Sequence, residues 1–442
     1  MLNPQSQQAL AELPGVRAFV AGALLLRSGC FSLMGRKYRA LDDSCRAARY
    51  ADGTGIVGSL AMSRVEAGID AIARAERNPV AEAYLQDQTS ERDAAVYALS
   101  GKGGKADLLR DLIVLKKYTP DEKGVILLKY ARTFSAIVGL LDVPKLQERY
   151  TFVLEPCWAG YCDPCILMLI GRGHPLIVMC FTEEDHRYVE KLGAHVVPVR
   201  LGPADWVDAS VFAAPQVTEK PYDLVMVANW GAHKRHSQLF RALQDVRDRD
   251  VRVLLCGFAW ASRTADDVRR EAAAFANPRV QIEIMENLPH AKLADYVARS
   301  KVFVFLTRKE GDNKALVEAM FADVPVIVYD KTIGGAGSRV NSATGVFASD
   351  EQLAGKIVHM LDHHREFTPR QWALANTGSA VATRVLDDAL RRAVTGAGGR
   401  YTTPIVEKTN APNLAYKDPS VRADFAADYE FILGCQRVSS RS

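Results

Sequence analysis

Two glutamates and the loop between them carry the clearest chemistry in this sequence. Glu310 and Glu318 stand eight positions apart, and the residues between them pass from a polar loop at Gly311 into an apolar stretch with helical spacing. A helix start presents unpaired backbone N–H groups and a positive dipole end, which favour an anion such as a diphosphate. A carboxylate can accept both hydroxyls of a ribose cis-diol. The spacing is therefore typical of a sugar-nucleotide site, although glutamates near helix starts are also common for dipole reasons alone.

A basic stretch follows an earlier apolar run, Leu224 to Ala228. It contains Lys234 and Arg235, with a histidine on either side. Taken alone, this stretch is equally consistent with a solvated loop.

A loop in the first half of the chain also has residues suited to a sugar. Trp158 and Tyr161 can stack on a sugar face, and Glu155 can accept hydroxyls, with Gly160 in the same loop. The loop follows a predicted strand and precedes a predicted helix, which is where ligands bind in open parallel sheets. The alternative is that these residues are core anchors and helix caps. We expect an acceptor-side role for the loop.

Two patterns could indicate a metal, and we interpret neither as a metal site. Cys157, Cys162 and Cys165 have a spacing that iron–sulfur proteins use, but Cys180 would have to be the fourth ligand. Cysteines in a strand–turn–helix context are more often core residues. The Asp-x-Asp pair at 248–250 precedes a strand, so it lies at the sheet edge opposite the expected ligand site. We therefore expect no metal and no cofactor.

Strands alternate with helix-length segments in two stretches, which predicts two parallel sheets covered on both faces. The first stretch has strands near 111–115, 125–130, 150–154, 176–180 and 195–199, and the second near 224–228, 251–256, 280–284, 302–306 and 324–328. Two such sheets that face each other would form a cleft at the carboxyl ends of their strands. We expect a helical N-terminal segment, an acceptor domain, a donor domain and a helical tail that packs back on the acceptor domain, at 1–100, 101–217, 218–385 and 386–442 respectively.

The stretch from Lys309 to Ile327 resembles the donor-site signature of family 4 retaining glycosyltransferases, which have the GT-B fold. It has Glu-Gly, then Glu-Ala-Met-x-Ala-x-x-Pro-Val-Ile, in the order of that signature. In the family, the first glutamate contacts the donor sugar and the second holds the nucleotide ribose. The resemblance implies these roles for Glu310 and Glu318. It also implies donor binding by the loop between them, whose residues are Gly311, Asp312, Asn313 and Lys314.

A second match lies upstream, and the resemblance covers roughly residues 220–365. Family members have an arginine and a lysine after the first strand of this domain, and both neutralise the donor diphosphate. Lys234 occupies the lysine position, but Asn229 stands where the arginine is expected. Asparagine brings no charge, so we expect Arg235 or Lys314 to compensate.

The resemblance implies a GT-B protein that transfers a sugar from a nucleotide diphosphate sugar with retention and without a metal. Glu310 and Lys234 would be its catalytic residues. The acceptor would be a glycan or a lipid-linked molecule, and the sequence does not identify the nucleotide base. Two other interpretations stay open: a nucleotide-sugar epimerase, and a non-catalytic module that binds sugar nucleotides or glycans.

Charge and hydropathy indicate the remaining partners. A formal charge of +4 is too small to indicate a nucleic-acid partner, and eight scattered cysteines favour a reducing, cytoplasmic location. Residues 1–50 carry seven basic side chains against three acids around the apolar run 18–26. We expect that run to be too short to cross a bilayer. Residues 16–49 are then either an ordinary packed helical region or a basic amphipathic segment at the inner face of the membrane.

Overall fold

The structure, a computed structural model, forms two compact units that each have a β-sheet of their own. It describes residues 13–52, 55–74, 110–130, 133–134, 137–138, 141–156, 164–170, 174–212 and 219–435. The six-stranded unit comprises the described residues of 203–382 and 410–412. The five-stranded unit comprises the described residues of 10–202, 383–409 and 413–442. The expected α/β class with two largely parallel sheets is confirmed.

The sheet of the six-stranded unit is parallel throughout, in the order β11-β10-β9-β6-β7-β8. Its strands are β6 (Tyr222–Val227), β7 (Val251–Gly257), β8 (Val280–Glu286), β9 (Ser300–Phe305), β10 (Val326–Tyr329) and β11 (Gly345–Ala348). The chain starts in the middle at β6, builds outward to β8, and returns to β9 on the other side of β6. At such a reversal the loops after the two central strands diverge, and ligands bind between them.

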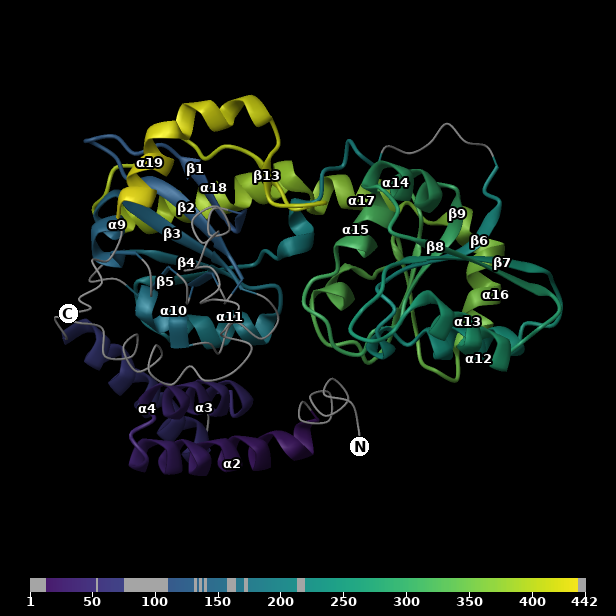
Figure 1. The fold of residues 1–442 in the computed structure, drawn as a ribbon, viewed down its shortest axis with the longest axis horizontal. Coiled ribbons are helices and arrows are strands. Elements are labelled where there is room, and N and C mark those ends of the chain that lie inside the picture. The colour runs from purple at the N-terminus through teal and green to yellow at the C-terminus, as the bar shows by residue number, and fades with distance from the viewer. Residues whose placement is uncertain are drawn as a thin grey trace. The chain divides into compact units, whose positions relative to one another are not determined.

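Helices cover both faces of this sheet because its strands are apolar on both sides. Along β9, Val302 and Val304 point into one core while Phe303 and Phe305 point into the other. One core lies under α12 (His236–Gln244), α13 (Ala265–Ala274) and α16 (Leu353–His363). The other lies under α14 (His290–Ala298), α15 (Lys314–Phe321) and α17 (Pro369–Asn376), and Figure 1 shows the two helical layers.

The sheet of the five-stranded unit has its strands in chain order, β1-β2-β3-β4-β5, with β1 antiparallel and the rest parallel. They are β1 (Leu112–Lys116), β2 (Gly124–Lys129), β3 (Tyr150–Glu155), β4 (Leu176–Met179) and β5 (Val196–Val199). This order has no reversal, so it differs from the doubly wound arrangement of the six-stranded unit. Right-handed crossovers that all step the same way place their helices on one face.

The C-terminal tail covers the other face of that sheet. Helices α10 (Pro164–Leu169) and α11 (Glu183–Glu190) lie on one side, and α18 (Ser379–Gly396) and α19 (Ala426–Gly434) on the other (Figure 1). The Tyr416 hydroxyl donates to the carbonyl of Val114 in β1 at 2.7 Å, and the Tyr150 hydroxyl donates to Asp428 at 2.7 Å. The remaining elements of this unit are α9 (Val143–Arg149), β12 (Lys408–Thr409), β13 (Ala415–Tyr416) and the short helix η6 (Pro419–Phe425).

In the described part of the chain before β1, three helices pack as outer layers on the five-stranded unit. They are α2 (Pro14–Leu33), α3 (Lys37–Tyr50) and α4 (Gly55–Arg74). Arg49 in α3 pairs with Asp185 in α11 at 3.1 Å, which ties the helices to the sheet layers. Among the described helices, α2 alone is long and apolar enough to cross a membrane, over Val16–Leu33. The helix is therefore longer than the apolar run 18–26, and whether it contacts a membrane stays a prediction.

The six-stranded unit begins before the predicted boundary at residue 218. The short helix η2 (Pro203–Trp206) belongs to it, because the backbone N–H of Ala204 donates to Asp312 and Asp205 pairs with Arg339. These contacts join η2 to residues more than 100 positions away, so the local composition around residue 218 does not predict them.

Candidate functional site

Two loops far apart in the sequence meet at the reversal between β6 and β9. The ammonium of Lys234 lies 2.6 Å from a carboxylate oxygen of Glu310, across a sequence separation of 76 residues. Lys234 follows β6 and Glu310 follows β9, so both lie beyond the carboxyl ends of the two central strands. The structure therefore brings the two predicted catalytic residues together at the place where open parallel sheets bind ligands.

The turn after β6 is built to hold Lys234 in place. Lys234 ends the short helix η3 (Ala232–Lys234), and only 7% of its surface is exposed. Asn229 accepts a hydrogen bond from the backbone N–H of Gly231 at 3.0 Å. A Cβ on Gly231 would lie 2.4 Å from the ring of His233, so a side chain there would force that ring to move. Asn229 thus shapes this turn, and its predicted contact with the donor stays a prediction.

Arg235 is committed to a structural contact. Its backbone has φ of +64°, a left-handed conformation that costs a residue with a Cβ some strain. Its guanidinium contacts both carboxylate oxygens of Asp350 at 2.6 Å and the carbonyl of Leu306 at 3.1 Å, and it lies over the ring of Tyr329. Compensation for Asn229 by Arg235 would require this guanidinium to leave Asp350.

The loop after β9 holds the second partner. Asn313 donates to Glu310 at 3.0 Å, and its side-chain oxygen caps α15 by accepting from the N–H of Leu316 at 2.8 Å. Each oxygen of Glu310 therefore has a defined partner, one being Asn313 and the other Lys234. A Cβ on Gly334 would lie 1.8 Å from the carbonyl oxygen of Glu310. The backbone at Gly334 therefore packs directly against the backbone of the Glu310 loop.

Asp312 is not presented to a ligand, contrary to its predicted role in donor binding. Its side chain is fully buried, pairs with both guanidinium nitrogens of Arg339 and accepts from the N–H of Ala204 at 3.0 Å. Arg339 also contacts Asp205 at 2.8 Å. The cluster fixes the loop that carries Glu310, and a contact of this carboxylate with a donor would require it to leave Arg339.

Glu318 lies in the second turn of α15 and is nearly buried. Its carboxylate lies 3.0 Å from Nε2 of His290, the first residue of α14. The ring of His290 packs edge-on against Phe212 at 5.2 Å. Sequence reasoning missed His290, because it stands 28 positions before Glu318 and no local pattern links the two.

Lys314 begins α15, and its ammonium donates to the carbonyl of Asn410 at 2.7 Å. This contact fastens the segment 410–412 to the six-stranded unit. Its predicted part in diphosphate binding stays a prediction, as does that of Gly311.

Two neutral imidazoles lie beside Lys234. Burial, together with a smaller effect of nearby cations, lowers the pKa of His233 to about 4 and the pKa of His236 to about 3. Neither ring nitrogen of His236 has a hydrogen-bond partner among the described residues. Lys234 is therefore the cation of this turn that pairs with Glu310.

The predicted acceptor loop is described only in part. Glu155 ends β3, is 1% exposed and pairs with the buried ammonium of Lys408 at 3.1 Å. An acceptor could reach this carboxylate only if the pair opened, so its role towards the acceptor stays a prediction. Trp158, Gly160 and Tyr161 lie outside the described residues.

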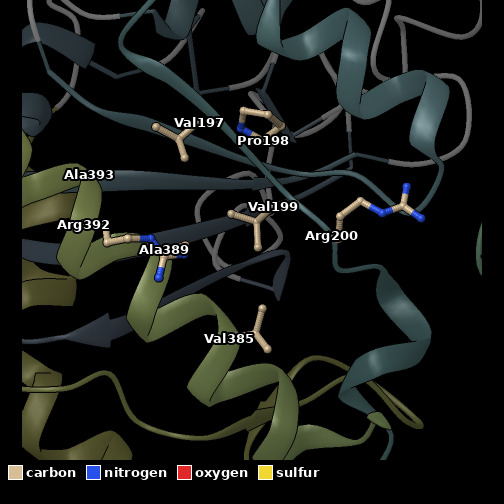
Figure 2. Close-up of a pocket in the computed structure, with 8 residues that line it drawn as sticks. All are labelled: Val197, Pro198, Val199, Arg200, Val385, Ala389, Arg392 and Ala393. Carbon is tan, nitrogen blue, oxygen red and sulfur yellow. The ribbon is translucent and has the colours of Figure 1, made fainter.

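A hollow of about 400 Å³ lies elsewhere in the five-stranded unit, between β5 and α18 (Figure 2). Its lining is mostly apolar and includes Val197, Val199, Val385 and Ala389, with Arg200 and Arg392 as the charged residues. Few polar groups line it, so it does not suit the hydroxyls of a sugar.

The two patterns considered for metals do not form a metal site in the described structure. Asp248 and Asp250 are exposed and pair with Arg249 and Arg279 at the amino end of β7. Cys165 and Cys180 are buried, whereas Cys157 and Cys162 lie outside the described residues. In the part of the chain that the structure describes, no three His, Cys, Asp or Glu side chains gather in a way that could hold a metal ion.

Comparison with protein-family models links the six-stranded unit to sugar transfer. Residues 209–367 match the model of glycosyl transferases, group 1. That match includes both the Lys234 turn and the Glu310 loop. No curated protein matches the chain.

Solved structures are similar to the chain at low identity. They include TarM of S. aureus (14% identity over 60% of this chain and 54% of that chain, TM-score 0.45). A glycosyltransferase from Rickettsia africae ESF-5 has 15% identity over 59% of this chain and 73% of that chain, with a TM-score of 0.45. Anabaena Alr3699/HepE in complex with UDP has 13% identity over 60% of this chain and 78% of that chain, with a TM-score of 0.46. The chain thus spans little more than half of TarM.

Proposed function

We propose that this chain transfers a sugar from a nucleoside diphosphate sugar to an acceptor hydroxyl, with the donor bound at the carboxyl edge of the six-stranded sheet. The contact between Lys234 and Glu310 carries the proposal, because it places an ammonium and a carboxylate side by side at the reversal of the sheet. The match of residues 209–367 to glycosyl transferases, group 1, supports it.

Each residue has a task that its chemistry suits. Lys234 neutralises the diphosphate as the bond between the anomeric carbon and the phosphate oxygen breaks. First-turn N–H groups of α15 add to this, since Asn313 caps only one of them. Glu310 accepts from hydroxyls of the donor sugar. Glu318, held by His290, accepts from the ribose hydroxyls.

Retention of configuration and independence from metal belong to the same proposal. They rest on the resemblance of the stretch 309–327 to family 4 retaining glycosyltransferases, not on the geometry. The acceptor hydroxyl takes the place of the diphosphate on the anomeric carbon and releases its proton. We infer a glycan or lipid-linked acceptor, a cytoplasmic location and polysaccharide synthesis as the setting.

A Lys234→Gln variant tests the proposal. A well-matched control is Lys301→Gln, because Lys301 also forms an ion pair, with Asp223 at 2.7 Å, but at the start of β9. Release of nucleoside diphosphate would be measured over a panel of donor sugars. We expect Lys234→Gln to lose roughly a hundredfold or more of turnover, as when one preorganised charge-stabilising group is removed. Equal turnover in the two variants would remove Lys234 from the chemistry.

One observation favours a second candidate, a module that binds sugar nucleotides without turnover. Asn229 is neutral and the guanidinium of Arg235 is held by Asp350, so neither residue offers a free charge in place of the arginine that the resemblance leads us to expect. Nucleotide binding without product from any donor and acceptor would support this candidate. Interconversion of sugar nucleotides without an acceptor would instead indicate an epimerase.

A further inference from the structure

Helix α2 presents an apolar stripe to solvent along its whole length. The large side chains of the stripe are Phe19, Leu26 and Leu33, which are 78%, 76% and 91% exposed. Ala23 and Cys30 lie between them and are exposed as well. These positions follow a three- and four-residue spacing, so they form one line that is about 21 Å long at 1.5 Å per residue.

The opposite side of α2 is the side that packs on the protein. Ala21, Leu25 and Ser28 are buried, and Ser28 donates to the carbonyl of Ala40 in α3 at 2.8 Å. Arg64 in α4 donates to the carbonyl of Leu25 at 3.1 Å. Helix α2 lies outside α3 and α4, away from the sheet of its own unit (Figure 1). The apolar stripe is therefore the outer surface of this unit.

The turn after the stripe is basic. Residues 13–41 contain five basic side chains and no acidic one. Arg36 and Lys37 are exposed and follow the last residues of the stripe directly. The nearest acids, Asp42 and Asp43, pair with Arg46 and Arg27 at 3.0 and 2.6 Å, so they are already neutralised.

We propose that α2 lies along the surface of a lipid bilayer with anionic headgroups, with its stripe immersed and Arg36 and Lys37 on the lipid phosphates. Large apolar side chains on one line, next to exposed cations, are what an interfacial helix requires. The inference is independent of the proposed function, because the stripe and the nucleotide site lie in different units.

Two other occupants fit the observations less well. A membrane-spanning α2 would have to leave α3 and α4 and bury the ion pair of Arg27 in hydrocarbon. A second copy of the chain could pair through the stripe, because a two-stranded coiled coil has the same three- and four-residue spacing of apolar residues. Such seams are flanked by charges of opposite sign, whereas every charge on α2 is positive.

Flotation of the full chain with vesicles tests the proposal. We expect it to float with phosphatidylcholine vesicles that contain phosphatidylglycerol and not with phosphatidylcholine alone, and to be released by carbonate. Leu26→Glu together with Leu33→Glu should weaken binding roughly a hundredfold, about tenfold for each anchor. Leu374→Glu is the control, because Leu374 in α17 is another exposed leucine. Nucleoside diphosphate binding should be unchanged in both variants, so failure here differs from failure of the proposed function.

A label on Cys30 gives a second measurement that needs no folding of a charged variant. An environment-sensitive fluorophore there should report an apolar surrounding when the anionic vesicles are added, with Cys30→Ser showing what is due to other thiols. Three results would overturn the proposal. They are equal flotation of the stripe variant and the control, resistance to carbonate extraction, and a lipid-free dimer that the stripe variant abolishes without any vesicle binding.

Discussion

The ion pair of Lys234 and Glu310 neutralises itself when no ligand is bound. Glu310 is partly exposed while Lys234 is nearly buried, so a phosphate can approach the pair from the side of the carboxylate. A diphosphate must therefore compete with Glu310 for the ammonium. This competition makes the two residues separable by experiment.

Glu310→Gln should raise the affinity for a nucleoside diphosphate while lowering sugar turnover. The amide keeps the shape but no longer competes for Lys234, and a partly exposed pair contributes up to about 1 kcal/mol, or roughly fivefold in affinity. Turnover falls because the carboxylate no longer accepts from the donor sugar. Calorimetric titration and product release measure the two effects. Weaker nucleotide binding in Glu310→Gln would contradict the competition.

At the scale of elements, the buried cluster of Asp312, Arg339 and Asp205 holds the loop that carries Glu310. Arg339 supplies one guanidinium to two carboxylates that are shielded from water. Arg339→Met would remove the cation that the two carboxylates share, and such a loss inside a protein costs about 3–5 kcal/mol. Arg249→Met is the comparison, because Arg249 also pairs with two aspartates, but on the surface, where the expected loss is below about 1 kcal/mol. Urea unfolding of both variants measures the difference, and equal losses would contradict a structural role for the cluster.

The first residue of α12 should make stability depend on pH. Burial, the largest cause, lowers the pKa of His236 to about 3, below its usual value near 6.5. Protonation then favours the unfolded chain, so this contribution is complete above about pH 6.5 and is lost as the pH falls towards 3. Between pH 7.5 and 5.5 the loss is about 1.4 kcal/mol.

His236→Phe removes this titration while it keeps a ring beside Trp230, which lies 5.5 Å away. The free energy of unfolding of the native chain, relative to that of the variant, should therefore decline by about 1.4 kcal/mol over the same range. Denaturant titrations at a series of pH values measure it. Parallel profiles for the two proteins would mean that folding does not lower the pKa of His236.

Local patterns predict the elements well and the pairing of side chains poorly. A strand expected near 280–284 is β8, and the apolar stretch with helical spacing after Gly311 is α15. The apolar periods that indicate these elements lie within each segment. The partners of Asp312 and Glu318, by contrast, come from other loops at separations of 27 and 28 residues. Only the packing of the sheet brings these partners together. The sequence therefore shows no sign that Asp312 is paired with Arg339, and it predicts that this residue binds a ligand.

The two units of the whole molecule are built on separate cores, although the chain passes between them more than once. Helix α18 begins in the six-stranded unit and continues in the five-stranded one, while residues 410–412 return to the first. The contacts of Lys314 with Asn410 and of Lys408 with Glu155 fasten neighbouring residues of the tail to different units. Each unit therefore depends on the tail, but its sheet is its own.

This separation predicts where a nucleotide slows hydrogen exchange. A nucleoside diphosphate at a hundred times its dissociation constant adds about 2.7 kcal/mol to the stability of the unit that binds it. Amides of residues 229–235 and 310–316 should gain protection first, and those of β6 and β9 with them, because their opening exposes the site. Strands β2 and β3 should keep their rates, since they share no hydrogen bonds with that sheet. Mass spectrometry of peptides from both units measures this, with Lys234→Gln as the control that lacks the main cation. Equal protection of both sheets would show that the units open together, and protection confined to β2 and β3 would move the nucleotide site to the five-stranded unit.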